Sequence, residues 1–196
     1  MAGSTMHDAD RTHEPPTARE PRELDHAQLA AALAERCRLE GEFVLRSGRI
    51  ATHYFDKYLF EADPHLLSEI ARHMATLVPS ETEVLAGLEL GGVPVAVALA
   101  SVTGLPACFV RKKAKEYGTA RLAEGAEIDG RNVLVVEDVV TTGGQLVMST
   151  QDLRERGAHI TTALCVIDRR EPGPSPLDDA NLTLRPLFTA PELAGP

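Results

Sequence analysis

Two adjacent carboxylates, Glu137 and Asp138, follow four consecutive apolar residues at positions 133–136. An apolar, β-branched run of this kind is typical of a strand buried on both faces, so we expect the two acids at the end of that strand. Two valines and the turn sequence Thr-Thr-Gly-Gly-Gln at 141–145 come next. Backbone N–H groups of such a turn, at the start of a helix, bind phosphate without a cationic side chain. Because carboxylates accept hydrogen bonds from sugar hydroxyls, the segment predicts a polyol phosphate site rather than a solvated acidic turn.

A second stretch that could do chemistry is cationic. Residues 111–121 hold five Lys or Arg and one Glu, a net charge of +4 in a chain whose formal net charge is −9. Positive charge gathered on an acidic protein concentrates the electrostatic field where a polyanion must sit. A solvated basic loop is the other interpretation that composition alone allows.

Composition excludes several other functions. A net charge of −9 is unfavourable for general nucleic-acid binding, which needs a cationic surface against phosphate. We find no apolar run long enough to span a bilayer and no apolar core of a signal peptide, so neither nucleic acid nor membrane is an expected partner. The three cysteines, Cys37, Cys108 and Cys165, are far apart and form no CxxC pair. Reduced thiols in a cytoplasmic protein are therefore expected, without a disulfide framework or a zinc site.

The elements that must position these residues alternate between strands and helices. Residues 1–23 are polar and predict a disordered leader. A helix should begin at the capping box of Asp25 and Gln28 and end at Gly41, and another should begin at Asp63-Pro64. We expect extended segments at 42–45 and 53–60, strands at 84–86, 107–110, 133–136, 160–167 and 182–188, and further helices at 93–102 and 146–153. This order predicts one α/β domain over residues 24–196, with a mostly parallel twisted sheet flanked by helices. In such sheets ligands bind at the carboxyl ends of the strands, here the loops after Ala86, Val110, Val136 and Ile167.

Residues 133–145 resemble the diphosphoribose-binding motif of the type I phosphoribosyltransferases, and residues 111–118 resemble the mobile loop of one subfamily, the orotate phosphoribosyltransferases. The segments 42–49, 53–56 and 87–94 and the pair Asp168-Arg169 are similar to other motifs of that subfamily. The resemblance runs from about residue 25 to 193. It implies the type I fold with a small N-terminal hood, formed by residues 24–60 and the C-terminal strand.

The resemblance also implies the reaction, which is transfer of the 5-phosphoribosyl group from phosphoribosyl diphosphate to orotate in pyrimidine biosynthesis. The catalytic residues would be Lys112, Lys115, Tyr117 and Asp138. The residues that bind phosphoribosyl diphosphate would be Arg46, Arg111, Lys112, Lys115, Tyr117, Glu137, Asp138, Val139, Val140, Thr141, Thr142, Gly143, Gly144 and Gln145. Orotate would contact Tyr54, Phe55, Thr141 and Arg169.

The same resemblance implies Mg²⁺ held mainly through the diphosphate, with no direct protein ligand, and a homodimer in which the mobile loop reaches the neighbouring subunit. Two positions depart from the family pattern. Tyr117 stands where many members have histidine, and Gly91 stands where many have lysine. Two other functions stay open at this point: transfer to another nucleobase, and a non-catalytic regulator that senses phosphoribosyl diphosphate.

Overall fold

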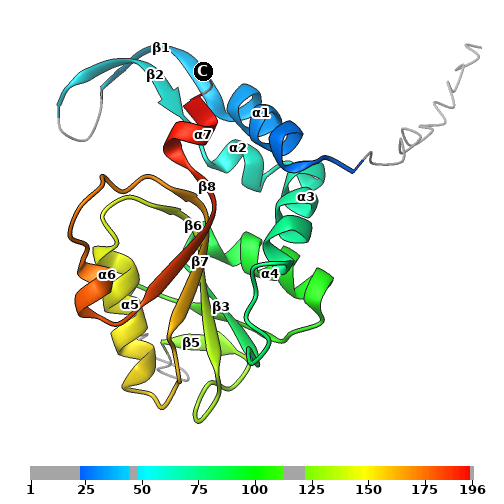
Figure 1. Ribbon diagram of the computed structural model, residues 1–196, viewed down its shortest axis with the longest axis vertical. Coiled ribbons are helices and arrows are strands. Elements are labelled where there is room, and N and C mark those ends of the chain that lie inside the picture. Colours follow the sequence, from blue (N-terminus) through cyan, green and yellow to red (C-terminus); the bar gives the residue numbers. More distant parts are fainter. Residues whose placement is uncertain (1–22, 45–47, 113–121, 195–196) are drawn as a thin grey trace, which may run out of the picture.

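A six-stranded sheet forms the centre of the molecule in the computed structural model, which describes residues 23–44, 48–112 and 122–194 (Figure 1). The strand order is β5-β4-β3-β6-β7-β8. The strands are β3 (Val84–Leu88), β4 (Ala107–Val110), β5 (Ala123–Gly125), β6 (Val133–Val140), β7 (Thr162–Asp168) and β8 (Thr183–Thr189). Only β5 is antiparallel to its neighbour. The predicted mostly parallel α/β sheet is confirmed.

Helices cover both faces of this sheet (Figure 1). One face carries α3 (Pro64–Ala75) and α4 (Gly92–Thr103), and the other carries α5 (Gly144–Arg154) and α6 (Pro176–Asp179). Because successive strand residues point to opposite faces, β6 contributes Leu134 and Val136 to one hydrophobic core and Val133 and Val135 to the other. The strand is therefore buried on both sides, as its apolar sequence predicts.

A smaller layer lies over the carboxyl ends of the strands (Figure 1). It consists of α1 (His26–Cys37), the antiparallel pair β1 (Arg38–Val44) and β2 (Ile50–Phe55), α2 (Tyr58–Glu61) and α7 (Ala190–Ala194). We call these elements the hood. The N–H of Asp56 donates to the carbonyl of Cys37 at 2.8 Å and so joins the end of β2 to the end of α1.

Local start and stop signals predict several helix ends correctly. The side chain of Asp25 accepts the Gln28 N–H at 2.8 Å, and the Gln28 side chain accepts the Asp25 N–H at 3.1 Å. Asp63 caps α3, with proline at its first turn, and α4 ends at Gly104, whose φ of 75° is left-handed. These contacts span few residues, so the sequence alone specifies them.

Other boundaries differ because long-range pairing overrides local signals. The first helix ends at Cys37 rather than Gly41, since Arg38 already pairs with Phe55, and Gly41 lies within an irregular part of β1. The extended segment expected over 53–60 stops at Phe55 and is followed by α2. The carboxylates at 137 and 138 lie within β6 rather than after it, because pairing with β7 continues to Val140.

Three further features of the sheet and the termini differ from expectation. β5 lies between the expected strands at 107–110 and 133–136, where we expected no strand, and α7 was not expected either. The C-terminal strand does not belong to the hood, because β8 pairs with β7 along its whole length. α7, which follows it, supplies the C-terminal part of the hood by packing against α1. Except for Glu23, the predicted leader lies outside the described residues.

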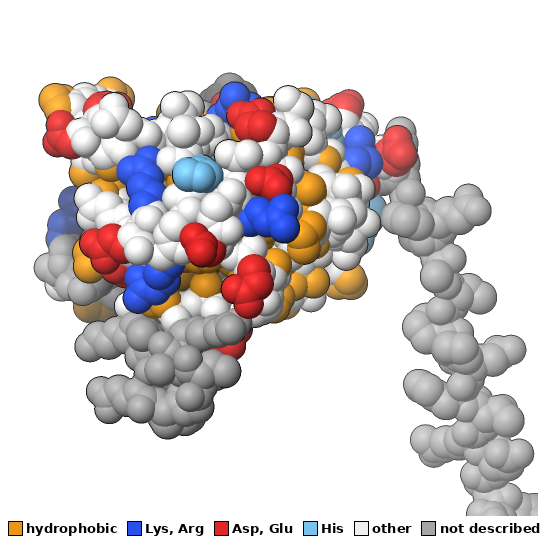
Figure 2. Space-filling model, turned by 90° about the horizontal axis from the view of Figure 1, so that it is seen from below, with side chains coloured by type: hydrophobic (Ala, Val, Ile, Leu, Met, Phe, Trp, Pro, Cys, Tyr) orange, Lys and Arg blue, Asp and Glu red, His pale blue; other side chains and the backbone are white. Residues whose placement is uncertain are grey.

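The surface opposite the hood shows Lys and Arg interspersed with Asp and Glu, with no large area of one sign on the part that Figure 2 displays. An exposed ion pair, Arg131 with Glu83 at 2.7 Å, connects β6 and β3 at their amino ends. In the ranges that the structure describes, no helix has the length and apolar character needed to cross a bilayer.

Candidate functional site

The turn at 141–145 joins β6 to α5 and has the form of an anion site. Thr141 and Thr142 are exposed, and Gly143 precedes the helix with a left-handed φ of 81°. The N-cap residue Gly143 has no side chain to cap this helix start, and the one side-chain contact to a first-turn amide is the long bond of 3.5 Å from the Gly144 N–H to Thr142 Oγ1. A cavity of about 70 Å³ opens beside the turn. Amides and helix dipole together favour a phosphate group there, as the sequence predicts.

Glu137 lines this cavity. Its Oε1 accepts the N–H of Asp138 at 3.2 Å. Burial first, and then the hydrogen bond to Asp138 and the negative charge of Asp138, together raise the pKa of the Glu137 carboxyl to about 9. Glu137 therefore carries a proton at neutral pH in the free protein and can donate as well as accept a hydrogen bond.

Asp138 is not among the residues that line that cavity. It is the next residue of β6, and its fully buried side chain lies beside Gly91 and against Lys57. Its Oδ1 accepts the N–H of Val139 at 2.6 Å, and its Oδ2 forms an ion pair with Lys57. Burial opposes ionisation of Asp138, but hydrogen bonds with Glu137, Glu61 and Lys57 outweigh it and hold its pKa below the ordinary value.

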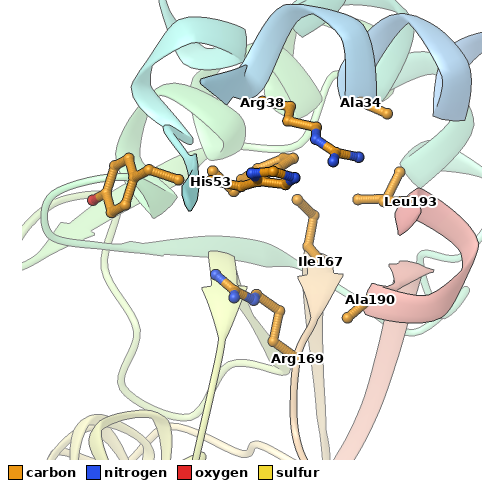
Figure 3. Close-up of a pocket in the computed structure, with 9 residues that line it drawn as sticks. Ala34, Arg38, His53, Ile167, Arg169, Ala190 and Leu193 are labelled. Atoms are coloured by element: carbon orange, nitrogen blue, oxygen red, sulfur yellow. The ribbon is translucent and has the colours of Figure 1, made fainter. Parts of the chain in front are cut away.

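A pocket of about 280 Å³ separates the hood from the carboxyl end of β7 (Figure 3). Its lining residues are Ala34, Arg38, His53, Tyr54, Phe55, Ile167, Arg169, Ala190 and Leu193. In Figure 3, Arg38 comes from the hood and Arg169 from the end of β7, and they lie on opposite sides of the His53 ring. The described residues that line this space supply two guanidinium groups, an imidazole and no carboxylate, which suits a flat anionic ligand.

The pocket and the turn are neighbours. The N–H of Arg169 donates to the carbonyl of Val140 at 2.8 Å, directly before Thr141. The structure thus brings Tyr54, Phe55 and Arg169, which we predicted to contact the acceptor base, next to the predicted phosphate turn.

The residue after Arg169 has a different role. The guanidinium of Arg170 binds the carboxylate of Asp168 through contacts of 2.8 and 3.0 Å and also donates to Ser175 Oγ at 3.0 Å. These bonds fix the segment after β7, which lines a cavity of about 500 Å³ together with Thr141 and Thr142. This cavity of about 500 Å³ therefore extends the site along the edge of the sheet where β6 and β7 end.

The cationic stretch starts at this edge too. Arg111 and Lys112 are exposed directly after β4, and the N–H of Arg111 donates to the carbonyl of Leu122 at 2.9 Å. The predicted site residues Arg46, Lys115 and Tyr117 lie outside the described residues, so their roles stay predictions.

Sequence reasoning missed three residues of the site: Arg38, His53 and Lys57. Arg38 was expected within the first helix, so its position at the start of β1 was hidden by the wrong helix end. Lys57 reaches Asp138 from a distant segment, and no short-range pattern reports such a pairing. The sequence signal for His53 was its place beside Tyr54 and Phe55, which we predicted to contact orotate.

Comparison with known proteins defines the class to which this arrangement belongs. The model of the phosphoribosyl transferase domain matches residues 60–183. The chain belongs to the phosphoribosyltransferase family, and the predicted type I fold is confirmed.

Within that family its relatives are orotate phosphoribosyltransferases, as the motifs predicted. The enzyme of that name from Nocardioides sp. is 55% identical over 167 residues, which are 85% of this chain and 93% of the relative. The one from Halobacterium salinarum is 46% identical over 78% of this chain and 87% of its own length. Among solved structures, orotate phosphoribosyltransferase of Mycobacterium tuberculosis H37Rv in complex with inorganic phosphate has a TM-score of 0.75 and 28% identity, and the match covers 86% of this chain and 98% of that one.

Proposed function

We propose that this protein transfers the 5-phosphoribosyl group from phosphoribosyl diphosphate to N1 of orotate, releasing orotidine 5′-monophosphate and diphosphate. The relatives and the described geometry both support this reaction. The observation that carries it is the cationic pocket of Arg38, His53 and Arg169, which adjoins the anion-binding turn through the bond from Arg169 to Val140. Orotate is a flat carboxylate, and a guanidinium fork binds a carboxylate in a bidentate way. Uncharged bases such as uracil give such a pocket no charge to pair.

In the reaction the bond from C1 of the ribose to the diphosphate oxygen breaks, the bond from C1 to N1 of orotate forms, and the proton of N1 passes to the departing diphosphate or to solvent. Positive charge develops on the ribose ring and negative charge on the leaving diphosphate. Fixed groups aimed at these charges make the largest contribution to catalysis. Arg111 and Lys112 lie at the correct edge of the sheet to face the diphosphate, and Lys115 and Tyr117 would act with them.

The turn at 141–145 would hold the 5′-phosphate through its amides and hydroxyls. Glu137, at the rim of the adjoining cavity, would bind a ribose hydroxyl. Asp138 would contribute negative charge beneath the developing positive ring, and would have to turn towards the substrate to bond a hydroxyl directly.

Mg²⁺ fits this site through the substrate. Within the described ranges, no group of three or more His, Cys, Asp or Glu side chains is arranged to hold a metal ion. Mg²⁺ commonly keeps several waters and binds through substrate phosphates, so the diphosphate would supply its main ligands. When bound, the ion would add positive charge at the diphosphate oxygens.

We also infer a homodimer. The outer face of α4 and the neighbouring strand expose large apolar side chains, namely Val97, Val102 and Phe109, which are 46%, 48% and 36% exposed. Covering such side chains with a second copy would bury apolar surface. The segment that resembles the mobile loop of the subfamily, residues 111–118, would then reach the neighbouring site. The three buried, free cysteines fit a reducing, cytoplasmic setting.

A single spectrophotometric assay tests the reaction. With phosphoribosyl diphosphate and Mg²⁺ present, orotate absorbance should fall, and orotidine 5′-monophosphate and diphosphate should appear in equal amounts. Uracil, hypoxanthine and adenine serve as competing acceptors. Turnover of any of these above orotate would reject the acceptor assignment, and no turnover of any base would reject the transferase.

A further inference from the structure

Asp138 is the most deeply placed acid of the site, and its surroundings hold two more carboxyls and one ammonium. Its side chain is 1% exposed. Glu61 from α2 and Glu137 from β6 both hydrogen-bond with it, and Lys57 is its cation. An ionised carboxylate buried in this way is costly unless a partner compensates its charge.

Lys57 is the only described cation paired with Asp138, and it comes from the segment between β2 and α2. Its side chain is 32% exposed, so the pair has a buried acid end and a base end that reaches solvent. The ammonium also lies 5.3 Å from the centre of the Tyr58 ring. Two contacts therefore hold this ammonium in place between hood and sheet.

The loop before α4 has no room to supply another cation. A Cβ atom on Gly91 would overlap Oδ2 of Asp138 and would lie 2.6 Å from Oε1 of Glu61. That Glu61 oxygen is itself buried, and it faces the same space as Oδ2 of Asp138. The carboxyls thus fill the space above Gly91, and charge compensation of Asp138 depends on Lys57.

We propose that Lys57 is a positioning residue for the transfer reaction, which keeps the Asp138 carboxylate ionised and oriented so that it can act on the ribose of phosphoribosyl diphosphate. The inference rests on the proposed function, because it assigns Lys57 a role through the donor half of that site. This ion pair couples the hood to the sheet, because Lys57 lies between β2 and α2 and Asp138 lies in β6.

Titration calorimetry with phosphoribosyl diphosphate and Mg²⁺ on the full chain tests this role. Lys57→Met should raise the Kd at pH 7 about tenfold or more, whereas Lys57→Arg, which keeps the charge, should restore affinity to within about threefold. Arg131→Met removes a cation from an ion pair at the other end of β6 and should leave the Kd unchanged. Thermal unfolding of each variant shows whether it is folded, and Lys57→Gln replaces Lys57→Met if the latter is not.

A double-mutant cycle separates action through Asp138 from direct contact with the diphosphate. Asp138→Asn alone should weaken binding, and adding Lys57→Met to it should weaken binding no further than about twofold. Effects that multiply in the double variant would overturn the proposal, and so would a Kd unchanged by Lys57→Met. If the unaltered chain fails to bind phosphoribosyl diphosphate, it is the proposed function that fails.

The pH dependence of binding distinguishes this role of Lys57 from a merely structural one, which would not change that dependence. The groups that interact electrostatically with Asp138 are Lys57, Glu61, Glu137 and, from β7, Cys165. Without the ammonium, Asp138 ionises only at higher pH, so binding by Lys57→Met should recover as pH rises. If the Kd for phosphoribosyl diphosphate changed with pH in the same way for Lys57→Met and for the unaltered chain, the inference would be contradicted.

Discussion

Neighbouring residues at the end of β7 have different surroundings, and Arg169 and Arg170 are the clearest case. Arg170 is held by Asp168, whereas Arg169 lines the pocket between hood and sheet. Residue type alone does not distinguish the two arginines, and it was the resemblance of the Asp168-Arg169 pair to the family motif that predicted Arg169 as the contact to orotate. The hydrogen bonds of the folded segment distinguish them.

Replacing Arg169 tests the acceptor half of the site. Arg169→Met should raise the KM for orotate at least tenfold, because a charge-assisted hydrogen bond to a carboxylate contributes about 1.5–3 kcal/mol. The Kd for phosphoribosyl diphosphate should stay within about twofold. Arg185→Met, on a surface arginine that donates to the carbonyl of Leu77, is the control. An equal rise in KM for both variants would contradict the assignment.

Lys115 lies outside the described residues, so its role depends on the motif at 111–118. Lys115→Ala should lower kcat about 100-fold or more, because it removes a fixed positive charge that faces the leaving diphosphate. The circular dichroism spectrum of the variant should be unchanged. Lys113, which has no counterpart in the motif, provides the matched control, and Lys113→Ala should reduce kcat far less. Activity near that of the unaltered chain would exclude the role given to Lys115.

At the scale of elements, the junction of β6 and α5 requires a glycine at one position and tolerates a side chain at the next. Gly143 has a φ of 81°, and a Cβ atom there would overlap Leu177. Gly144 lies in the first turn of the helix, and the nearest atom to its Cβ would be Thr142 Oγ1 at 3.8 Å.

Gly143→Ala should therefore lower the free energy of unfolding by about 1–3 kcal/mol, from left-handed backbone strain and the clash with Leu177. Gly144→Ala should change it by no more than about 0.5 kcal/mol. Urea denaturation of the two variants compares them directly. Equal stability losses would show that the junction is not held as described.

For the whole molecule, the buried acids of the site govern how stability depends on pH. The pKa of Glu61 is raised to about 8 and that of Glu137 to about 9, chiefly by burial and by the hydrogen bond each makes with Asp138. An unfolded glutamate titrates near 4.3, so between that pH and 8 to 9 the folded state binds more protons than the unfolded state. Stability then falls as pH rises through this window.

The urea midpoint of the free protein should accordingly decrease between pH 6 and pH 9. Glu137→Gln should flatten this decrease, because the amide has no proton to lose. Glu83, whose pKa is lowered by hydrogen bonds from Asn132 and Arg131, stays ionised across the same range, so Glu83→Gln should leave the slope unchanged. A midpoint that rises with pH in the unaltered protein would contradict the assignment of raised pKa values.

The sequence by itself determined the features that depend on short-range contacts. Capping at Asp25 and Asp63 and the glycine turn before α5 each involve residues a few positions apart, so their local chemistry is sufficient. The apolar run of β6 likewise predicts burial on both faces, and the motif after it predicts the class of ligand.

Only the tertiary structure decided which distant groups meet. Lys57 pairs with Asp138, Arg38 faces Arg169 across a pocket, and β8 joins the large sheet rather than the hood. Glu137 lines the cavity beside the turn, whereas Asp138 is buried against Lys57, and pairing with β7 places both acids within β6. These outcomes depend on packing between segments far apart in the chain, and the local pattern of residues carries no information about such packing.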